Sequence, residues 1–459
     1  MSPTSDVAGW VAGLALAAVP AVAVERAKAA ILDTLAVTLA GSSEPVARLA
    51  AKIVAQDGAR PVCSQLGGRL RTSAPEAAFL NGIAAHALDY DDVNIGPANH
   101  PSAVILPAAL AVAEAREASG RQLLEAYVAG VEITSKFARA LEYGHYQAGW
   151  HTTSTAGTMG AAMAAGKLLE LDAKRLGTAL GIAASEASGL RQNFGTMAKP
   201  FHAGHAARSG VTAARLAAEG FSAYDRILES QLGYFAIFNG PAGAAQQASE
   251  QLGRPFELES PGLAAKKFPC CYGLHRAAEG MLELVERAGF QAEDVRQVHV
   301  SAPVGELAPL SPERPRTGLE GKFSLGYALA AAVIDRRLTL ATFTDAMVQR
   351  PAAQDFWPLV HAQPHADAAL GRLLTEGILE LNVRLNDGAS HQIRVEDAPG
   401  TPARPLTPEE RQAKLADCAG KLLSESDVAS LQRLVASLEE LPDVRELIAQ
   451  LTAPSDSRR

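Results

Sequence analysis

The sequence is poor in cysteine and in aromatic side chains. Of 459 residues only four are cysteine, and 5% are aromatic. Four cysteines are too few for a disulfide framework in a chain of this length. The adjacent pair Cys270 and Cys271 also lacks the spacing of zinc ribbons, thioredoxin-like sites or iron–sulfur ligands. Cysteine usage therefore excludes a disulfide scaffold and indicates a reducing, cytoplasmic setting.

The sequence also lacks a long basic run, and its 50 Asp and Glu outnumber its 42 Lys and Arg. Nucleic-acid binding normally requires a basic patch, so we expect no nucleic-acid partner. Residues 7–24 carry no charge, but nothing basic precedes them and Pro20 interrupts them. They predict a buried helix followed by a second one near Ala21, rather than an export signal or a membrane span.

Alanine, glycine and leucine are abundant, and 48% of the residues are hydrophobic. At this length two domains are expected. Small side chains favour closely packed helices over an aromatic-rich sandwich or barrel. Apolar residues recur at helical spacing from Val24 to Leu39 and end at Gly41, and similar patterns predict helices at residues 103–118, 156–171 and 175–190.

The pattern changes near Leu263. Val298, Val300 and Ala302 alternate with polar residues, which predicts a strand. Residues 379–385 and 393–395 alternate around an Asn-Asp-Gly turn and predict a β-hairpin. Further helices are expected at 323–334, at 338–347 and after Thr407. We therefore expect a mainly α fold: a large helical domain built from residues 1–262 and 401–459, with a smaller α/β lid domain inserted at 263–400.

An acidic segment with histidines is the first candidate site. His86, Asp89, Asp91, Asp92 and His100 lie between two apolar stretches. On a helix, residues three apart are neighbours, so the first histidine and the first aspartate can meet. Acid/base catalysis, metal binding and a structural charge network are all compatible with this composition.

A hydroxyl-rich segment at residues 149–157 follows, with the sequence GWHTTSTAG. It contains His151 and Thr152 and leads into a predicted helix. The unpaired N–H groups at a helix start suit a carboxylate ligand. A simple Ser/Thr helix cap is the alternative interpretation.

Two basic segments supply the cations that an acidic ligand needs. Lys199, His202, His205 and Arg208 fall within ten residues, and Pro200 places Lys199 at a helix start. The helical repeat points Arg208 away from Lys199, so we expect Lys199 to face a pocket.

The second basic segment, residues 266–275, contains Lys266, Lys267 and His275. It lies at the predicted domain boundary, where clefts commonly form. Its lysines and histidine suit an anionic ligand, and we expect its two cysteines to be packing residues.

In this order, the segments resemble the MmgE/PrpD family, which includes 2-methylcitrate dehydratase, cis-aconitate decarboxylase and iminodisuccinate epimerase. The resemblance covers nearly the whole chain. It rests on HALDYDDVNIGPANHPSAVILP at 86–107, GWHTTSTAG at 149–157, AKPFHAGHAARSG at 198–210, KKFPCCYGLH at 266–275, EGKFSLGYALA at 320–330 and the turn at 386–388.

The resemblance implies a helical domain with a smaller α/β lid, a homodimer, and activity without a metal, an iron–sulfur cluster or another cofactor. It implies active-site roles for Asp89, His100, His151, Lys199 and His275, with Lys266 and Tyr327 lining the pocket. From the residues themselves we add Thr152, His202 and Lys267 as substrate-binding candidates.

The chemistry implied is removal of a proton beside a carboxylate of a small di- or tricarboxylate. Dehydration of a 2-methylcitrate-like substrate is the first hypothesis, and decarboxylation or epimerisation at the same site is the alternative. A catalytically inactive carboxylate-binding protein is the alternative from another class. Many relatives have Thr-His where this chain has Val93-Asn94, which leaves the substrate open.

The same resemblance suggests a division of roles. His100 and Lys199 would exchange protons with the substrate, and His275 would be the opposing acid or base. Asp89 would orient His100. Lys266, His151 and the N–H groups of residues 152–154 would hold substrate carboxylates.

Overall fold

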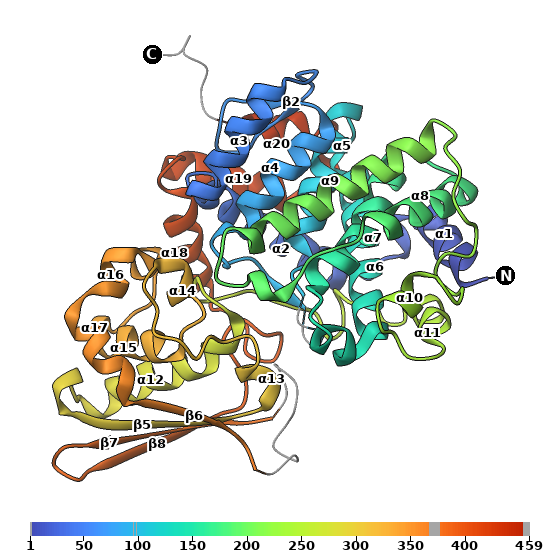
Figure 1. Ribbon diagram of the computed structural model, residues 1–459. Coiled ribbons are helices and arrows are strands. Elements are labelled where there is room, and N and C mark those ends of the chain that lie inside the picture. Colours follow the sequence, from blue (N-terminus) through green and yellow to red (C-terminus); the bar gives the residue numbers. More distant parts are fainter. Residues whose placement is uncertain (1, 95, 98, 367–376, 453–459) are drawn as a thin grey trace. The chain divides into compact units, whose positions relative to one another are not determined.

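The computed structural model describes residues 2–94, 96–97, 99–366 and 377–452. Ile95 and Ala98, within the acidic segment, lie outside this set. The chain forms two compact units (Figure 1). The larger unit comprises Met1–Asn193, Met197–Leu263 and Ala413–Arg459, and the smaller comprises Phe194–Thr196 and Ala264–Gln412. The fold is mainly α, as predicted, and no helix among the described residues is long and apolar enough to cross a bilayer.

The larger unit is mainly helical, and the strands among its described residues are two residues long, such as β1 (Cys63–Ser64), β2 (Arg71–Thr72) and β3 (Val93–Asn94). The second helix begins at Ala21 and ends at Gly41, as the periodicity predicted. The helices of this unit are α1 Pro3–Gly13, α2 Ala21–Gly41, α3 Pro45–Asp57, α4 Ala74–Ala87, α5 Ser102–Arg116, α6 Gly120–Gln147, α7 Thr152–Leu168, α8 Ala173–Glu186, α9 Ala198–Ala218, α10 Tyr234–Ile237, α11 Ala244–Glu250, α19 Glu425–Ala436 and α20 Arg445–Gln450; α18 (Pro408–Ala419) leads into it.

Glycines let the central helices approach closely, as the composition suggested. Helix α4 packs against α9, and the two run side by side in Figure 1. A Cβ at Gly82 would lie 2.8 Å from the Cα of Gly204, and a Cβ at Gly204 would collide with the carbonyl oxygen of Phe79. Only glycine fits such a backbone contact, so this crossing fixes the relative position of α4 and α9.

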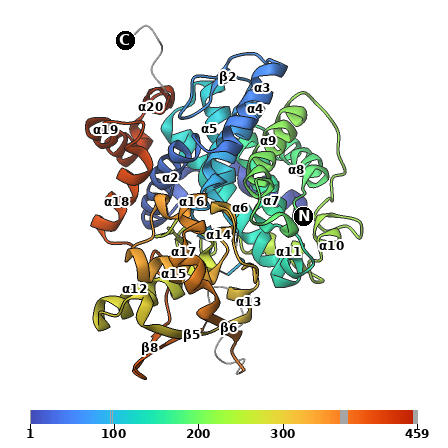
Figure 2. The ribbon, with the colours of Figure 1, turned by 60° about the vertical axis from the view of Figure 1, so that its left-hand side comes forward.

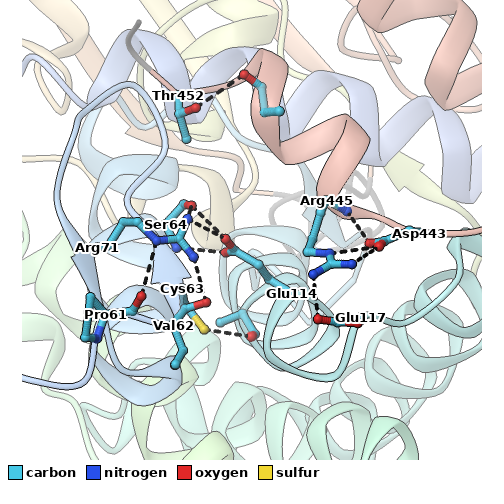
Figure 3. Close-up of polar contacts among 12 residues, drawn as sticks. Pro61, Val62, Cys63, Ser64, Arg71, Glu114, Glu117, Asp443, Arg445 and Thr452 are labelled. Atoms are coloured by element: carbon cyan, nitrogen blue, oxygen red, sulfur yellow. Dashed lines mark hydrogen bonds and ion pairs between the residues drawn. The ribbon is translucent and has the colours of Figure 1, made fainter. Parts of the chain in front are cut away.

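A buried carboxylate ties the end of α5 to the hairpin formed by β1 and β2 (Figure 3). Ser64 donates its backbone N–H and its hydroxyl to the carboxylate of Glu114, each at 2.7 Å, and Arg71 donates to the same group at 3.2 Å. Because a buried charge needs such partners, the three contacts hold α5 in place. Nearby, Arg445 pairs with both Glu117 and Asp443.

The smaller unit contains a four-stranded sheet within the described residues, in the order β6-β5-β7-β8. Its strands are β5 Val295–Ala302, β6 Val360–Pro364, β7 Leu379–Leu385 and β8 Ser390–Val395, and its helices are α12 His275–Ala288, α13 Val304–Leu307, α14 Gly318–Gly321, α15 Leu325–Asp335, α16 Asp345–Gln349 and α17 Pro351–Phe356. The predicted hairpin is confirmed, with Leu381 opposite Ile393. Helix α12 packs on β7 and β8, which buries the apolar face of the sheet (Figure 2).

One predicted helix of this unit is wrong. Residues 338–347 are divided into a 3-10 turn at Leu340–Phe343 and the separate helix α16. The hydroxyl of Thr344 accepts a hydrogen bond from the N–H of Met347 and so starts a new helix inside the predicted one. Strand β6 was not predicted because most of its residues are exposed and show no alternation.

Candidate active site

The turn that follows α4 places three aspartates in the interior. Leu88 caps the helix, and Asp89 has a φ of 51°, in the left-handed region that ends many helices. Aspartate tolerates this conformation better than most side chains. Asp89, Asp91 and Asp92 are all buried, so each carboxylate needs partners within the protein.

Asp91 binds two histidines. Its Oδ2 lies 2.9 Å from Nδ1 of His86 and 3.2 Å from Nδ1 of His100. The Nδ1 atom of His100 also lies 2.9 Å from the backbone carbonyl oxygen of Asp92. Burial raises the pKa of Asp91, but the two imidazoles together outweigh it and hold this pKa well below its usual value.

The neighbouring Asp92 points to a different set of partners. Ser102 donates its hydroxyl to the Asp92 carboxyl group, and the Ser102 oxygen lies 2.5 Å from the Tyr127 hydroxyl. Burial raises the pKa of Asp92 to about 7, and the charge of Asp91 adds to this effect. Near neutral pH the Asp92 carboxyl group is therefore partly protonated, whereas the Asp91 carboxylate is ionised.

The third aspartate of this turn, Asp89, pairs with Lys199. Lys199 is the second residue of α9, as Pro200 predicted, and its Nζ lies 2.8 Å from Oδ1 of Asp89. Nε2 of His100 lies 3.9 Å from the same oxygen. The orienting contacts of His100 thus come from Asp91 and the backbone of Asp92, whereas Asp89, expected to orient His100, pairs most closely with Lys199.

The start of α7 borders this cluster. His151 is the N-cap residue of the helix, and Thr152 opens it. The Thr153 hydroxyl accepts the backbone N–H of His100 at 3.1 Å, and the Ser154 hydroxyl donates to the carbonyl oxygen of His202 at 3.2 Å. These hydroxyls fix the surrounding segments, while the helix start supplies a partial positive charge that suits a carboxylate.

His151 and His202 face each other, with their Nδ1 atoms 3.0 Å apart. One of these nitrogens must carry the proton for a hydrogen bond to form. Burial, with the nearby histidines and Lys199, lowers the pKa of His151 well below its usual value and that of His202 to about 4. Both rings are therefore neutral near pH 7 and can bind a ligand by hydrogen bonds rather than by charge.

The remaining predicted residues lie in the smaller unit. His275 is the first residue of α12 and is buried, with the rings of Phe268 and Tyr272 centred 5.3 and 5.1 Å from its own. Lys266 is also buried. Cys270 and Cys271 are buried in the core of this unit, as expected for packing residues.

Two predicted substrate contacts of this unit have partners within the protein. The Nζ atom of Lys267 lies 2.9 Å from Glu279 and 2.8 Å from Glu410. The hydroxyl of Tyr327 donates to the carbonyl oxygen of Thr342 at 2.5 Å. Both side chains are therefore held by groups of the protein, and their roles as substrate contacts stay predictions.

The acidic cluster also offers metal-type donors. One atom each from His86, Asp89, Asp91 and His100 lie within 4.8 Å of one another. A cation held by Asp89 would meet the ammonium group of Lys199, which lies against the same carboxylate. The geometry therefore suits proton transfer by Lys199 and His100 beside Asp89 better than a metal centre.

Sequence reasoning placed Asp91 and His86 in the right segment but gave neither a role. His86 and Asp91 are five residues apart in the sequence, a separation that does not bring side chains together on a regular helix. They are in contact here because the chain leaves the helical path at the left-handed Asp89. Thr153 was also missed as the residue that holds the backbone of His100.

Two family models match most of the chain. The family model of the MmgE/PrpD N-terminal domain matches residues 5–247, and that of the MmgE/PrpD C-terminal domain matches residues 268–440.

Curated relatives match over nearly their whole length. A protein of Homo sapiens named cis-aconitate decarboxylase is 30% identical over 94% of this chain and 91% of its own. Proteins of the same name from Mus musculus and Aspergillus terreus are 29% and 28% identical, over 99% of this chain and 94% and 96% of theirs. The two domain models and these relatives show that the chain belongs to the MmgE/PrpD family.

Proposed function

We propose that this protein is a lyase that decarboxylates a small tricarboxylate of the cis-aconitate type, without a metal. The observation that carries the proposal is the buried group of Lys199, Asp89 and His100 beside the start of α7. Two proton-exchanging side chains flank one carboxylate, and a helix start that suits an anion borders them. The names of the nearly full-length relatives favour decarboxylation over the dehydration preferred from the sequence.

The proposed reaction breaks the carbon–carbon bond to one carboxylate and releases carbon dioxide. The electron pair of that bond moves into the unsaturated system, toward a remaining carboxylate. A proton then adds to carbon, so each turnover consumes one proton from solvent. The protein's task is to stabilise the developing negative charge and to deliver this proton.

The side chains divide these tasks in our proposal. The ammonium group of Lys199 stabilises the developing charge, and Lys199 or His100 delivers the proton. His151, His202 and the first N–H groups of α7, from Thr152 on, bind the carboxylates that are retained. For Lys266 and His275, a carboxylate contact and an acid/base role stay predictions from the family resemblance, as does a homodimer.

The decisive experiment incubates the purified protein with cis-aconitate in D₂O and follows the products by proton NMR, with carbon dioxide measured in parallel. Decarboxylation predicts carbon dioxide release and one deuterium at a carbon of the product. Citrate, 2-methylcitrate and an iminodisuccinate-type acid complete the panel.

The outcomes separate the alternatives. Water loss from a citrate-type acid without carbon dioxide would replace decarboxylation with dehydration. Deuterium exchange with inverted stereochemistry alone would indicate an epimerase. Binding of the panel acids with no turnover would indicate an inactive carboxylate-binding protein.

A further inference from the structure

The hydrogen bonds of His100 determine which of its ring nitrogens carries the proton. Two acceptors lie beside Nδ1: the Asp92 carbonyl oxygen at 2.9 Å and the Asp91 carboxylate at 3.2 Å. A lone pair on Nδ1 would face two negatively polarised oxygens. Nδ1 therefore carries the hydrogen, and in the neutral ring Nε2 carries the lone pair.

The Nε2 atom of His100 lies on the side of the ring nearer to Asp89. It is 3.9 Å from the Asp89 oxygen that binds Lys199. A basic nitrogen at this position is set to take or return a proton next to the amine. The opposite tautomer would present an N–H there and could not accept a proton.

Asp91 is itself held in one orientation. Nδ1 of His86 lies 3.0 Å from Oδ1 and 2.9 Å from Oδ2 of Asp91, so a second imidazole binds both oxygens. The carboxylate is fully buried, and its attraction for a positive ring is stronger there than in water. The Nε2 atom of His86 has no hydrogen-bond partner among the described residues, so the ring's hydrogen bonding is directed at Asp91.

We propose that Asp91 is a positioning residue that fixes His100 as the Nδ1–H tautomer and stabilises the ring when Nε2 takes up a proton, with His86 restraining the carboxylate. The kinetic part rests on the proposed function, whereas the tautomer does not. The arrangement follows the logic of a carboxylate that orients a general base.

Asp91→Asn tests the proposal, because the amide keeps the shape of the side chain and removes its charge. We expect kcat to fall by roughly 10²–10⁴-fold, with KM changed by less than about threefold. The matched control is Glu132→Gln, which removes another buried carboxylate of the larger unit. The Glu132 carboxylate accepts hydrogen bonds from the backbone N–H groups of Gly253 and Glu257 and has no part in the proposed site. We expect its kcat to stay within about threefold of wild type.

Long-range ¹H–¹⁵N NMR of protein with ¹⁵N-labelled histidine measures the tautomer of His100 directly. A purely structural role of Asp91 would leave this tautomer unchanged. The His100 signals are identified by their loss in His100→Gln. We expect the Nδ1–H tautomer in the wild type and in Glu132→Gln. In Asp91→Asn the amide N–H can donate to Nδ1 and only the Asp92 carbonyl oxygen still accepts from it, so we expect a larger population of the Nε2–H tautomer.

An Nε2–H tautomer in the wild type, or an unchanged tautomer in Asp91→Asn, would overturn the positioning role. Unchanged kcat in Asp91→Asn would overturn its kinetic consequence. If Asp91→Asn fails to fold, an Nε2–H tautomer in the wild type would still overturn the positioning role. If the wild type turns over none of the panel acids, the proposed function fails while the NMR result stands by itself.

Discussion

The ammonium group of Lys199 and the carboxylate of Asp89 form a buried ion pair, 2.8 Å apart, between the start of α9 and the turn after α4. Each side chain is about 95% shielded from solvent. Removing one partner of such a pair leaves a buried charge without compensation, so both residues affect stability as well as chemistry.

Lys199→Met should lower kcat by roughly 10²–10⁴-fold, because it removes a proton-exchanging group from the buried site. Arg208→Met on the same helix is the control. The Arg208 guanidinium lies over the ring of Phe79, and its Nη1 atom is 3.6 Å from Oε2 of Glu76. We therefore expect the turnover of Arg208→Met to remain within about threefold of wild type. A folded Lys199→Met variant with more than half of wild-type activity would remove Lys199 from the chemical step.

Metal removal should leave activity intact. Dialysis against a chelator, followed by elemental analysis and a turnover assay, measures this directly. Activity that disappears with chelation and returns with one divalent ion per chain would instead assign His86, Asp89, Asp91 and His100 to a metal centre.

Gly204→Ala should destabilise the larger unit by about 1–3 kcal/mol or more, because its methyl group would collide with the backbone of α4. Gly177→Ala in α8 is the matched control. No atom lies within 4 Å of its added methyl group, so a gain of about 0.5–1 kcal/mol is expected from the better helix propensity. Urea unfolding compares the two; equal stabilities would contradict the close crossing of α4 and α9.

Glu132 should make the stability of the larger unit depend on pH. Burial raises its pKa from 4.5 to about 7, so the folded state holds a proton that the unfolded state has lost between these values. The stabilisation of the folded state by Glu132 is complete below about pH 4.5, and it is lost as the pH rises to about 7. Glu132→Gln cannot titrate, so the free energy of unfolding of wild type relative to the variant should fall by up to about 3 kcal/mol from pH 4.5 to pH 8. A constant difference across this range would contradict the raised pKa.

The helices of the larger unit were predictable because apolar residues at helical spacing decide them locally. Ala21 and Gly41 bound a helix for reasons that lie within the sequence itself. The position of Lys199 at a helix start could be predicted because Pro200 follows it directly. In these cases neighbouring residues carry the whole signal.

Other features depend on contacts between distant residues. The amine of Lys267 pairs with Glu279 and Glu410, and no local pattern reveals that pairing. Its role as a substrate contact stays a prediction. The partner of Asp89 is likewise set by the crossing of α4 and α9. The orientation of Asp91 depends on one left-handed residue, which periodicity does not predict.

The left-handed backbone at Asp89 occupies a position where helices commonly end in glycine. An aspartate there costs the fold about 1 kcal/mol that glycine would not. In the proposed function the Asp89 carboxylate repays this cost by its part in catalysis. We therefore expect a relative that has lost the activity, and the lysine with it, to carry glycine at this helix end.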